Sequence, residues 1–84
     1  MATLLYADGH KETVNPKNGK TFELEELQGF VHGYIEIVHV GSDQLLVVDD
    51  EGLFNPLLPN LNASAIAGTM IVGDALLCES NEID

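Results

Sequence analysis

Two β-prone runs separated by a short turn dominate the middle of this 84-residue chain. Residues 34–40 are rich in β-branched side chains and predict a strand, after which Gly41-Ser42-Asp43 turns the chain back. Residues 44–48 predict a second strand, which is almost continuously apolar. Because such a strand has no face suited to water, we expect it to lie inside a sheet that is covered on both sides.

A hairpin and a helix are predicted before this pair of strands. The turn signal Asp8-Gly9 separates two short β-prone runs, residues 3–6 and 12–14. From about residue 23, apolar side chains recur at the spacing of one helical face. We expect this helix to end at Gly33, since glycine adopts the left-handed conformation that commonly closes a helix.

The last third of the chain predicts a loop and a short helix. Prolines exclude regular structure over residues 54–59. A short helix over residues 63–67 can then be capped by either Asn60 or Asn62, and Gly68 is its expected stop.

Two final strand pieces, residues 69–72 and 75–78, flank Gly73-Asp74, and residues 80–84 are expected to be a frayed acidic tail. Together the elements predict an α+β fold with a small, mostly antiparallel sheet of about five short strands, one main helix and one short helix. A chain of this length needs nearly all its large apolar residues for one core, so we expect residues 1–84 to form a single domain.

The charge balance of the chain is strongly acidic. Fourteen Asp and Glu oppose three lysines and no arginine, which gives a net charge of −11. The lysines all lie within residues 1–20, whereas residues 21–84 contain twelve Asp and Glu and no Lys or Arg. We therefore expect no direct binding to nucleic acid and none to an anionic membrane. A nucleic-acid mimic would need its acids gathered on one face, and a solvated acidic surface is the favoured alternative.

Location follows from two simpler observations. Cys78 is the only cysteine and sits in an apolar run, which is typical of a buried, reduced thiol. The sequence shows no signal peptide and no run long enough to span a membrane. We expect a cytoplasmic protein, in the host cytoplasm if a phage encodes it.

Catalytic and metal-binding patterns are not apparent in the sequence. His10, His32 and His39 have none of the spacings typical of a zinc site, and no serine or cysteine lies in a nucleophile motif. We therefore predict that the protein is not an enzyme and uses neither a metal nor a cofactor. A minor hydrolase using His32 or His39 with a carboxylate is a further alternative.

Five segments of the chain are similar to sequences of a known family, namely residues 22–28, 31–38, 47–52, 62–65 and 71–74. Through them the chain resembles, from about residue 22 to 78, a small family of uncharacterised proteins found in bacteriophages, plasmids and their bacterial hosts. In that family the helix-to-strand junction commonly reads Gly-Gly-Tyr-Ile-Glu, whereas this chain has His32 in place of the first glycine. The resemblance implies a domain of unknown function and supplies no mechanism.

The leading hypothesis is a non-enzymatic binding module of a bacteriophage or other mobile element. It would act by occupying a host protein that has a basic surface, as a counter-defence inhibitor. Tyr34 and Glu36 alternate with Ile35 along the strand and can present a polar surface, although tyrosine at such a position is more often in the core. The candidate binding residues are Tyr34, Glu36, Asp49, Asp50, Glu51, Asn62 and Asp74.

The alternative is a protein that sequesters a small nucleotide signal, with its pocket at the interface of a homo-oligomer. Without arginine, its phosphate recognition would rely on the three lysines, Lys11, Lys17 and Lys20, together with backbone amides. Self-association is possible under either hypothesis, because a small sheet has exposed edges that a second copy can cover.

Overall fold

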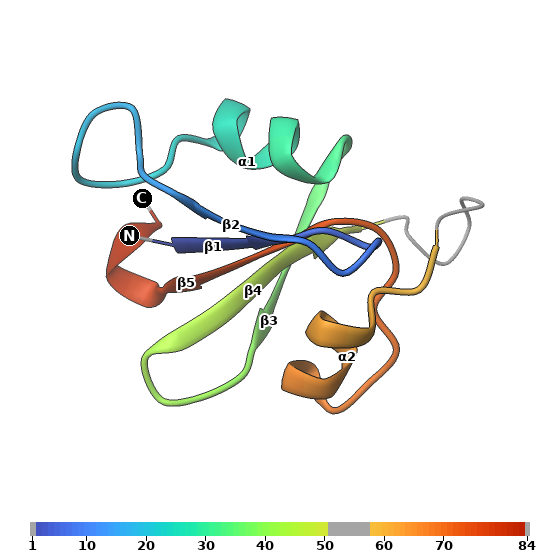
Figure 1. Ribbon diagram of the computed structural model, residues 1–84. Helices are drawn as coiled ribbons and strands as arrows, with labels where there is room; N and C mark the ends of the chain where they lie inside the picture. Colours follow the sequence, from blue (N-terminus) through green and yellow to red (C-terminus); the bar gives the residue numbers. More distant parts are fainter. Residues whose placement is uncertain (1, 51–57, 84) are drawn as a thin grey trace.

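A five-stranded antiparallel sheet with one helix on each face makes up the part of the chain that the structure describes, residues 2–50 and 58–83 (Figure 1). The structure is a computed structural model. Its elements are β1 (Ala2–Leu5), β2 (Lys11–Val14), α1 (Leu24–Val31), β3 (Ile35–His39), β4 (Gln44–Asp49), α2 (Leu61–Ala67), β5 (Ala75–Glu79) and the 3₁₀ helix η1 (Ser80–Glu82). The predicted α+β class is confirmed. None of these helices is long and apolar enough to cross a membrane.

The strands are arranged in the order β2-β1-β5-β4-β3, so β2 and β3 form the two edges of the sheet. The hairpins β1–β2 and β3–β4 form as predicted, and β5 joins them by pairing with β1 on one side and β4 on the other. The side chains of β4 alternate between two buried clusters, Leu45 and Val47 in one, Leu46 and Val48 in the other. The expectation that this apolar strand is covered on both faces is therefore confirmed.

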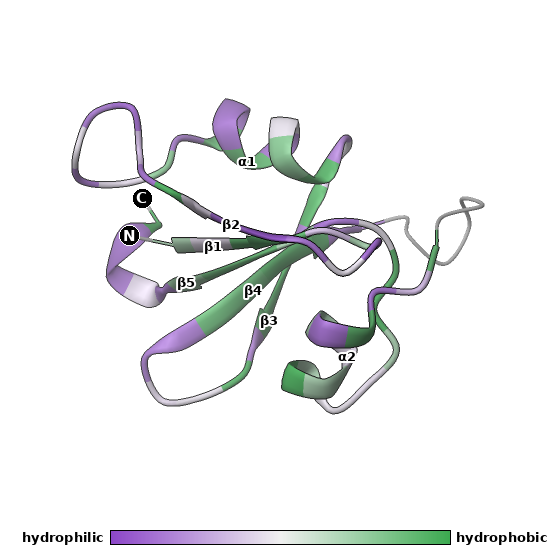
Figure 2. Cartoon of the chain, in the orientation of Figure 1, coloured by the Kyte–Doolittle hydropathy of each residue, from purple (hydrophilic) through white to green (hydrophobic). Residues whose placement is uncertain are grey.

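The two faces of the sheet carry separate hydrophobic clusters. On the α1 face, Phe22, Leu27 and Val31 pack among side chains of β1, β4 and β5, and the rings of Phe22 and Phe30 meet edge to face at 5.9 Å. On the α2 face the buried helical residue is Ala63, which packs with Ile71 and the opposite side chains of the same strands. Figure 2 shows the concentration of apolar residues along β4 and β5.

The ends of α1 differ partly from the prediction. Glu23 caps the start, and its backbone N–H donates to the Glu26 side chain at 3.2 Å. At the other end the left-handed residue is His32, with φ of 65°, and not Gly33. The geometry of the last turn explains this, because both the His32 and the Gly33 N–H groups donate to the carbonyl of Gln28, and that requires a left-handed residue at position 32.

The start of α2 resolves the choice between two caps. Asn60 is the N-cap and accepts a hydrogen bond from the Ala63 N–H, so the helix begins at Leu61, two residues earlier than predicted. Asn62 lies within the helix. Gly68 ends α2 as predicted, with φ of 72°.

Two segments near the C-terminus differ from the predicted structure. Residues 69–72 do not form a strand, and only Val72 makes a bridge, to Pro59, because Gly73 with φ of 76° turns the chain before β5 begins. In place of a frayed tail, residues 80–83 are tied to the core. The Phe22 N–H donates to the Glu82 carbonyl at 2.7 Å, Glu82 is buried, and Ile83 packs on the α1-face cluster. Most of the predicted loop over residues 54–59 lies outside the described residues.

Candidate functional site

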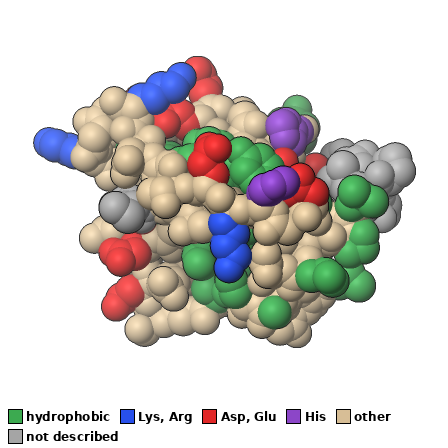
Figure 3. All heavy atoms as spheres, in the orientation of Figure 1, with side chains coloured by type: hydrophobic (Ala, Val, Ile, Leu, Met, Phe, Trp, Pro, Cys, Tyr) green, Lys and Arg blue, Asp and Glu red, His purple; other side chains and the backbone are tan. Residues whose placement is uncertain are grey.

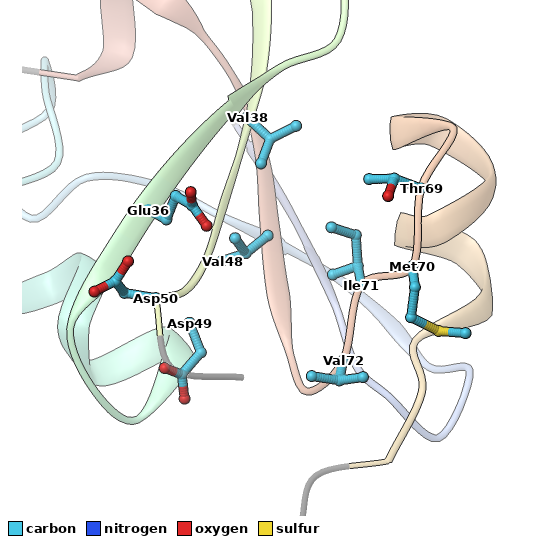
Figure 4. Close-up of a pocket in the computed structure, with 9 residues that line it drawn as sticks. All are labelled: Glu36, Val38, Val48, Asp49, Asp50, Thr69, Met70, Ile71 and Val72. Atoms are coloured by element: carbon cyan, nitrogen blue, oxygen red, sulfur yellow. The ribbon is translucent and has the colours of Figure 1, made fainter. Parts of the chain in front are cut away.

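A cleft of about 270 Å³ opens on the α2 face of the sheet, beside its β3 edge. One wall is the β3–β4 hairpin and the other is the segment that runs from α2 to β5 (Figure 4). The residues that line it are Glu36, Val38, Val48, Asp49 and Asp50 on the hairpin side, and Thr69, Met70, Ile71 and Val72 on the opposite side.

The floor of the cleft is apolar. Val48 and Ile71 are buried members of the α2-face cluster, and Val38 packs against them. In Figure 4 the Ile71 side chain faces the sheet, whereas Met70 turns away from it. Met70 is 61% exposed, so its thioether stands at the rim. The site thus offers a partner a short apolar surface with a flexible side chain beside it.

Carboxylates stand on the hairpin side of this apolar floor. Glu36 is exposed and pairs with Val48, so the two side chains share the cleft face of the sheet. Asp50 is exposed where β4 ends, and its N–H donates to the Tyr34 carbonyl at 2.9 Å. Among the described residues that line the cleft there is no lysine or arginine to neutralise them. The rim of the cleft is therefore negative and suits a cationic group.

Asp49 contributes to the same wall in a different way. It is half-buried and pairs with Ile35, which packs on the opposite face of the sheet. Its carboxylate lies 3.5 Å from the position that a Cβ on Gly33 would take. This places the carboxylate beside the junction of α1 and β3, on the α1 side of the rim.

Three other predicted binding residues, Tyr34, Asn62 and Asp74, do not line the cleft. Tyr34 immediately precedes β3 and is 69% exposed, so a core position is wrong for it. Asn62 is half-buried on α2. Asp74 accepts a hydrogen bond from the Ala7 N–H at 2.9 Å, and its other oxygen lies 3.4 Å from Nε2 of His32. Glu51 lies outside the described residues. Among the described residues of the predicted set, the structure therefore gathers Glu36, Asp49 and Asp50 and leaves Tyr34, Asn62 and Asp74 apart.

The three lysines are not gathered into a phosphate site. Figure 3 shows them well separated on the face that it presents. Lys20 borders a hollow of its own, but Glu79 and Glu82 line the same hollow and would repel a phosphate. The predicted set of Lys11, Lys17 and Lys20 therefore does not form a single cradle within one chain.

The histidines whose partners are defined lie on open surface. His10 Nδ1 is 2.9 Å from Asp8 and His32 Nε2 is 3.4 Å from Asp74, but the imidazole side chains are 81% and 72% exposed. Hydrogen bonds from His10 hold the pKa of Asp8 below its usual value. Among the described residues no group of three or more His, Cys, Asp or Glu side chains is placed to hold a metal ion.

Cys78 is a buried side chain of β5. Burial, with a smaller contribution from the charge of Glu82, raises the pKa of its thiol to about 12. The thiol is therefore protonated at neutral pH and a poor nucleophile.

Asn60 positions the wall of the cleft formed by the segment between α2 and β5. From the sequence, Asn60 was predicted only as a possible helix cap. It is fully buried, and its amide donates to the carbonyls of Leu5 and Gly73 at 2.9 and 2.8 Å. Its backbone N–H donates to the Ile71 carbonyl, and the Ser64 hydroxyl accepts from the Ile71 N–H. The capping spacing from Asn60 to Ala63 was the available signal, but Asn62 and Ala65 share it.

Comparison with known proteins gives one match. A family described as a domain of unknown function (DUF3846) matches residues 2–84. No curated protein and no solved structure matches the chain.

Proposed function

The chain belongs to the DUF3846 family of unknown function, and we propose that it is a non-enzymatic binding module. It would act by occupying a basic surface of a protein partner. The resemblance to phage and plasmid proteins makes a host protein the partner class. In that setting the module would inhibit a component of host defence.

One observation carries this proposal, the apolar cleft with an acidic rim. Val48 and Ile71 form its floor, while Glu36 and Asp50 stand exposed beside it in a stretch of the chain that has no lysine or arginine. An apolar centre with charges around it is the usual anatomy of a protein interface. The sign of those charges selects a cationic partner and accelerates its approach.

The surroundings of the imidazoles favour binding over catalysis. General acid–base chemistry benefits from a site that excludes water, whereas His10 and His32 meet their carboxylates on exposed surface. The separation of the lysines likewise gives no support to a nucleotide pocket within one chain.

Site-specific cross-linking from the rim of the cleft tests the proposal. A photoreactive amino acid replaces Met70, which is exposed at the rim, and in a matched control it replaces Thr13, which is exposed on the opposite edge strand. In host lysate we expect a protein with a basic surface to cross-link from position 70 and not from position 13. The yield should fall as salt rises from about 0.05 to 0.5 M, because salt screens exposed charges.

A charge-reversed variant completes the test. Glu36→Lys combined with Asp50→Lys should abolish the cross-link, whereas Glu12→Lys on β2 should leave it unchanged. A cross-linked partner that binds equally well to the charge-reversed cleft, or equally well at high salt, would contradict the proposal.

A further inference from the structure

The edge strand β3 has one row of backbone groups that no other strand uses. At one end the Tyr34 carbonyl accepts from the Asp50 N–H, and at the other the Val40 N–H donates to the Gln44 carbonyl. Because bonding alternates along an antiparallel strand, residues 34, 36, 38 and 40 bond to β4. Ile35, Ile37 and His39 therefore direct their N–H and C=O groups away from the sheet, where the strand order places no neighbour among the described residues.

The opposite edge is built differently. β2 carries exposed Lys11, Glu12 and Thr13 on successive positions, and mixed charges of this kind discourage further strand pairing. On β3 the apolar residues Ile35, Ile37 and Val38 are only half-buried, and Glu36 is the strand's one carboxylate. The β3 edge thus combines free hydrogen-bonding capacity with apolar surface and a single sign of charge.

We propose that β3 is a docking strand, to which an extended basic segment of the partner protein adds as the next strand of the sheet. This inference rests on the proposed function and specifies how the acidic cleft is used. Side chains alternate across a strand, so every second residue of the added segment would lie on the cleft face beside Glu36 and Val38. The residues between them would lie beside Ile35 and Ile37 on the α1 face.

The matching segment therefore alternates basic and apolar residues. A lysine or arginine beside Glu36 gains an opposite charge at cross-strand distance, and an apolar residue beside Ile37 covers a half-buried side chain. Backbone hydrogen bonds to Ile35, Ile37 and His39 would supply affinity, and the alternation would supply specificity.

Charge complementarity favours a partner over a second copy of this chain. A second β3 strand would bring another Glu36 and no cation, since residues 21–84 contain neither lysine nor arginine. Each copy also carries a net charge of −11, so pairing through this edge adds like charges.

Amide hydrogen exchange with a defined probe tests the inference. The probe is a blocked synthetic peptide of alternating Lys and Val, about nine residues long, which is within the usual length of a strand. Its control has the same sequence with an N-methyl group on every backbone amide, so that the charge remains but no backbone N–H donor is left. The exchange of individual amides in the full chain is followed by NMR.

We expect saturating peptide to slow exchange at Ile35, Ile37 and His39 by about tenfold or more, with little change at Glu36 and Val38, which already bond to β4. The N-methylated peptide should bind at least about tenfold more weakly, because it cannot form the new ladder. Glu36→Gln should weaken the unmodified peptide by about two- to fivefold, as a cross-strand charge pair would.

The possible failures are distinguishable. If both peptides bind equally well and binding still depends on Glu36 and Asp50, the docking-strand inference is overturned and the binding proposal stands. If neither peptide binds, or if binding ignores both carboxylates, the inference falls together with the charge complementarity of the proposed function. Slow exchange at Ile35, Ile37 and His39 without peptide, together with a doubled solution mass, would show that a second copy occupies the edge.

Discussion

The two faces of the sheet are covered in different ways. On one face α1 brings large side chains, Phe22 just before the helix and Leu27 and Val31 within it, into a buried hydrophobic cluster. On the other face α2 contributes the small residue Ala63, and the buried amide of Asn60 ties the start of the helix to Leu5 and Gly73. Packing of large side chains attaches α1 to its face of the sheet, whereas hydrogen bonds of a buried side chain fix α2 on the other face.

This difference accounts for the position of the cleft. A helix that packs through alanine covers less of the sheet than one that packs through leucine and phenylalanine, so part of the α2 face stays open between β3 and the segment before β5. Four large apolar residues on or near α2 are also exposed, namely Leu58, Leu61, Ile66 and Met70. The α2 face thus exposes more large apolar side chains than the α1 face, and it holds the cleft that we propose contacts a partner.

Among variants that test the difference between the two faces, Phe22→Ala is expected to change the free energy of unfolding most. Phe22 is 1% exposed and packs against Phe30, so its truncation should lower the free energy of unfolding by about 3–5 kcal/mol. Urea denaturation followed by circular dichroism measures the change. Leu24→Ala is the control on the same helix, because Leu24 is exposed and should change stability by less than about 0.5 kcal/mol. Equal costs for the two variants would contradict the core position of Phe22 on the α1 face.

Asn60→Ala should have the next largest effect. It removes a helix cap and leaves the carbonyls of Leu5 and Gly73 buried without this donor, which should cost about 2–4 kcal/mol. Asn62→Ala provides the matched control and should stay within about 0.5 kcal/mol, since Asn62 lies inside the helix and alanine favours helix. A similar loss for both variants would contradict the assignment of Asn60 as the residue that holds α2.

The two helix ends predict a pair of smaller and opposite changes. His32 and Gly68 both close a helix in the left-handed region, at φ of 65° and 72°. Only glycine adopts this conformation without strain, so His32→Gly should stabilise the protein and Gly68→Ala should destabilise it, each by about 1 kcal/mol. Thermal unfolding of the two variants measures the changes. A loss of stability in His32→Gly would mean that the contact between His32 and Asp74 outweighs the backbone strain.

The smallest effect on stability is expected at the rim of the cleft. Glu36→Gln removes one exposed charge and should change the free energy of unfolding by less than about 0.5 kcal/mol. The same variant should reduce capture of the basic partner and make the remaining binding less sensitive to salt. Glu12→Gln, exposed on β2, should alter neither property. Equal effects of both variants on binding would indicate that net charge, and not the cleft, attracts the partner.

Local sequence patterns were sufficient to predict much of the sheet. The continuous apolar run of β4 required cover on both faces, and the turns at Asp8-Gly9 and after Val40 identified two hairpins. The β3–β4 hairpin brings Glu36 near Asp49 and Asp50, so this wall of the cleft could be predicted from local strand pairing. The other wall could not, because the position of residues 69–72 depends on two hydrogen bonds of Ile71, whose carbonyl accepts from the Asn60 N–H and whose N–H donates to the Ser64 hydroxyl, and no local pattern predicted these bonds.

The mispredicted positions share a physical cause. Glycine is the usual residue in the left-handed conformation, so the sequence pointed to Gly33, while the hydrogen bonds to Gln28 place that conformation at His32. The acidic composition of residues 80–84 suggested a solvated tail. Glu82 is nevertheless buried, and its side chain accepts from the Glu79 N–H. In both cases specific hydrogen bonds outweigh the intrinsic preference of the residue.

The order of the strands also has a consequence for the way this molecule meets a partner. Lys11 lies on the edge strand β2. The opposite edge strand, β3, belongs to the part of the chain that has no lysine or arginine. A positively charged surface would therefore attract the β3 side of the protein more than the β2 side, where Lys11 and Glu12 offset each other. The protein would then tend to approach such a surface with its β3 side while the two are still separated by solvent.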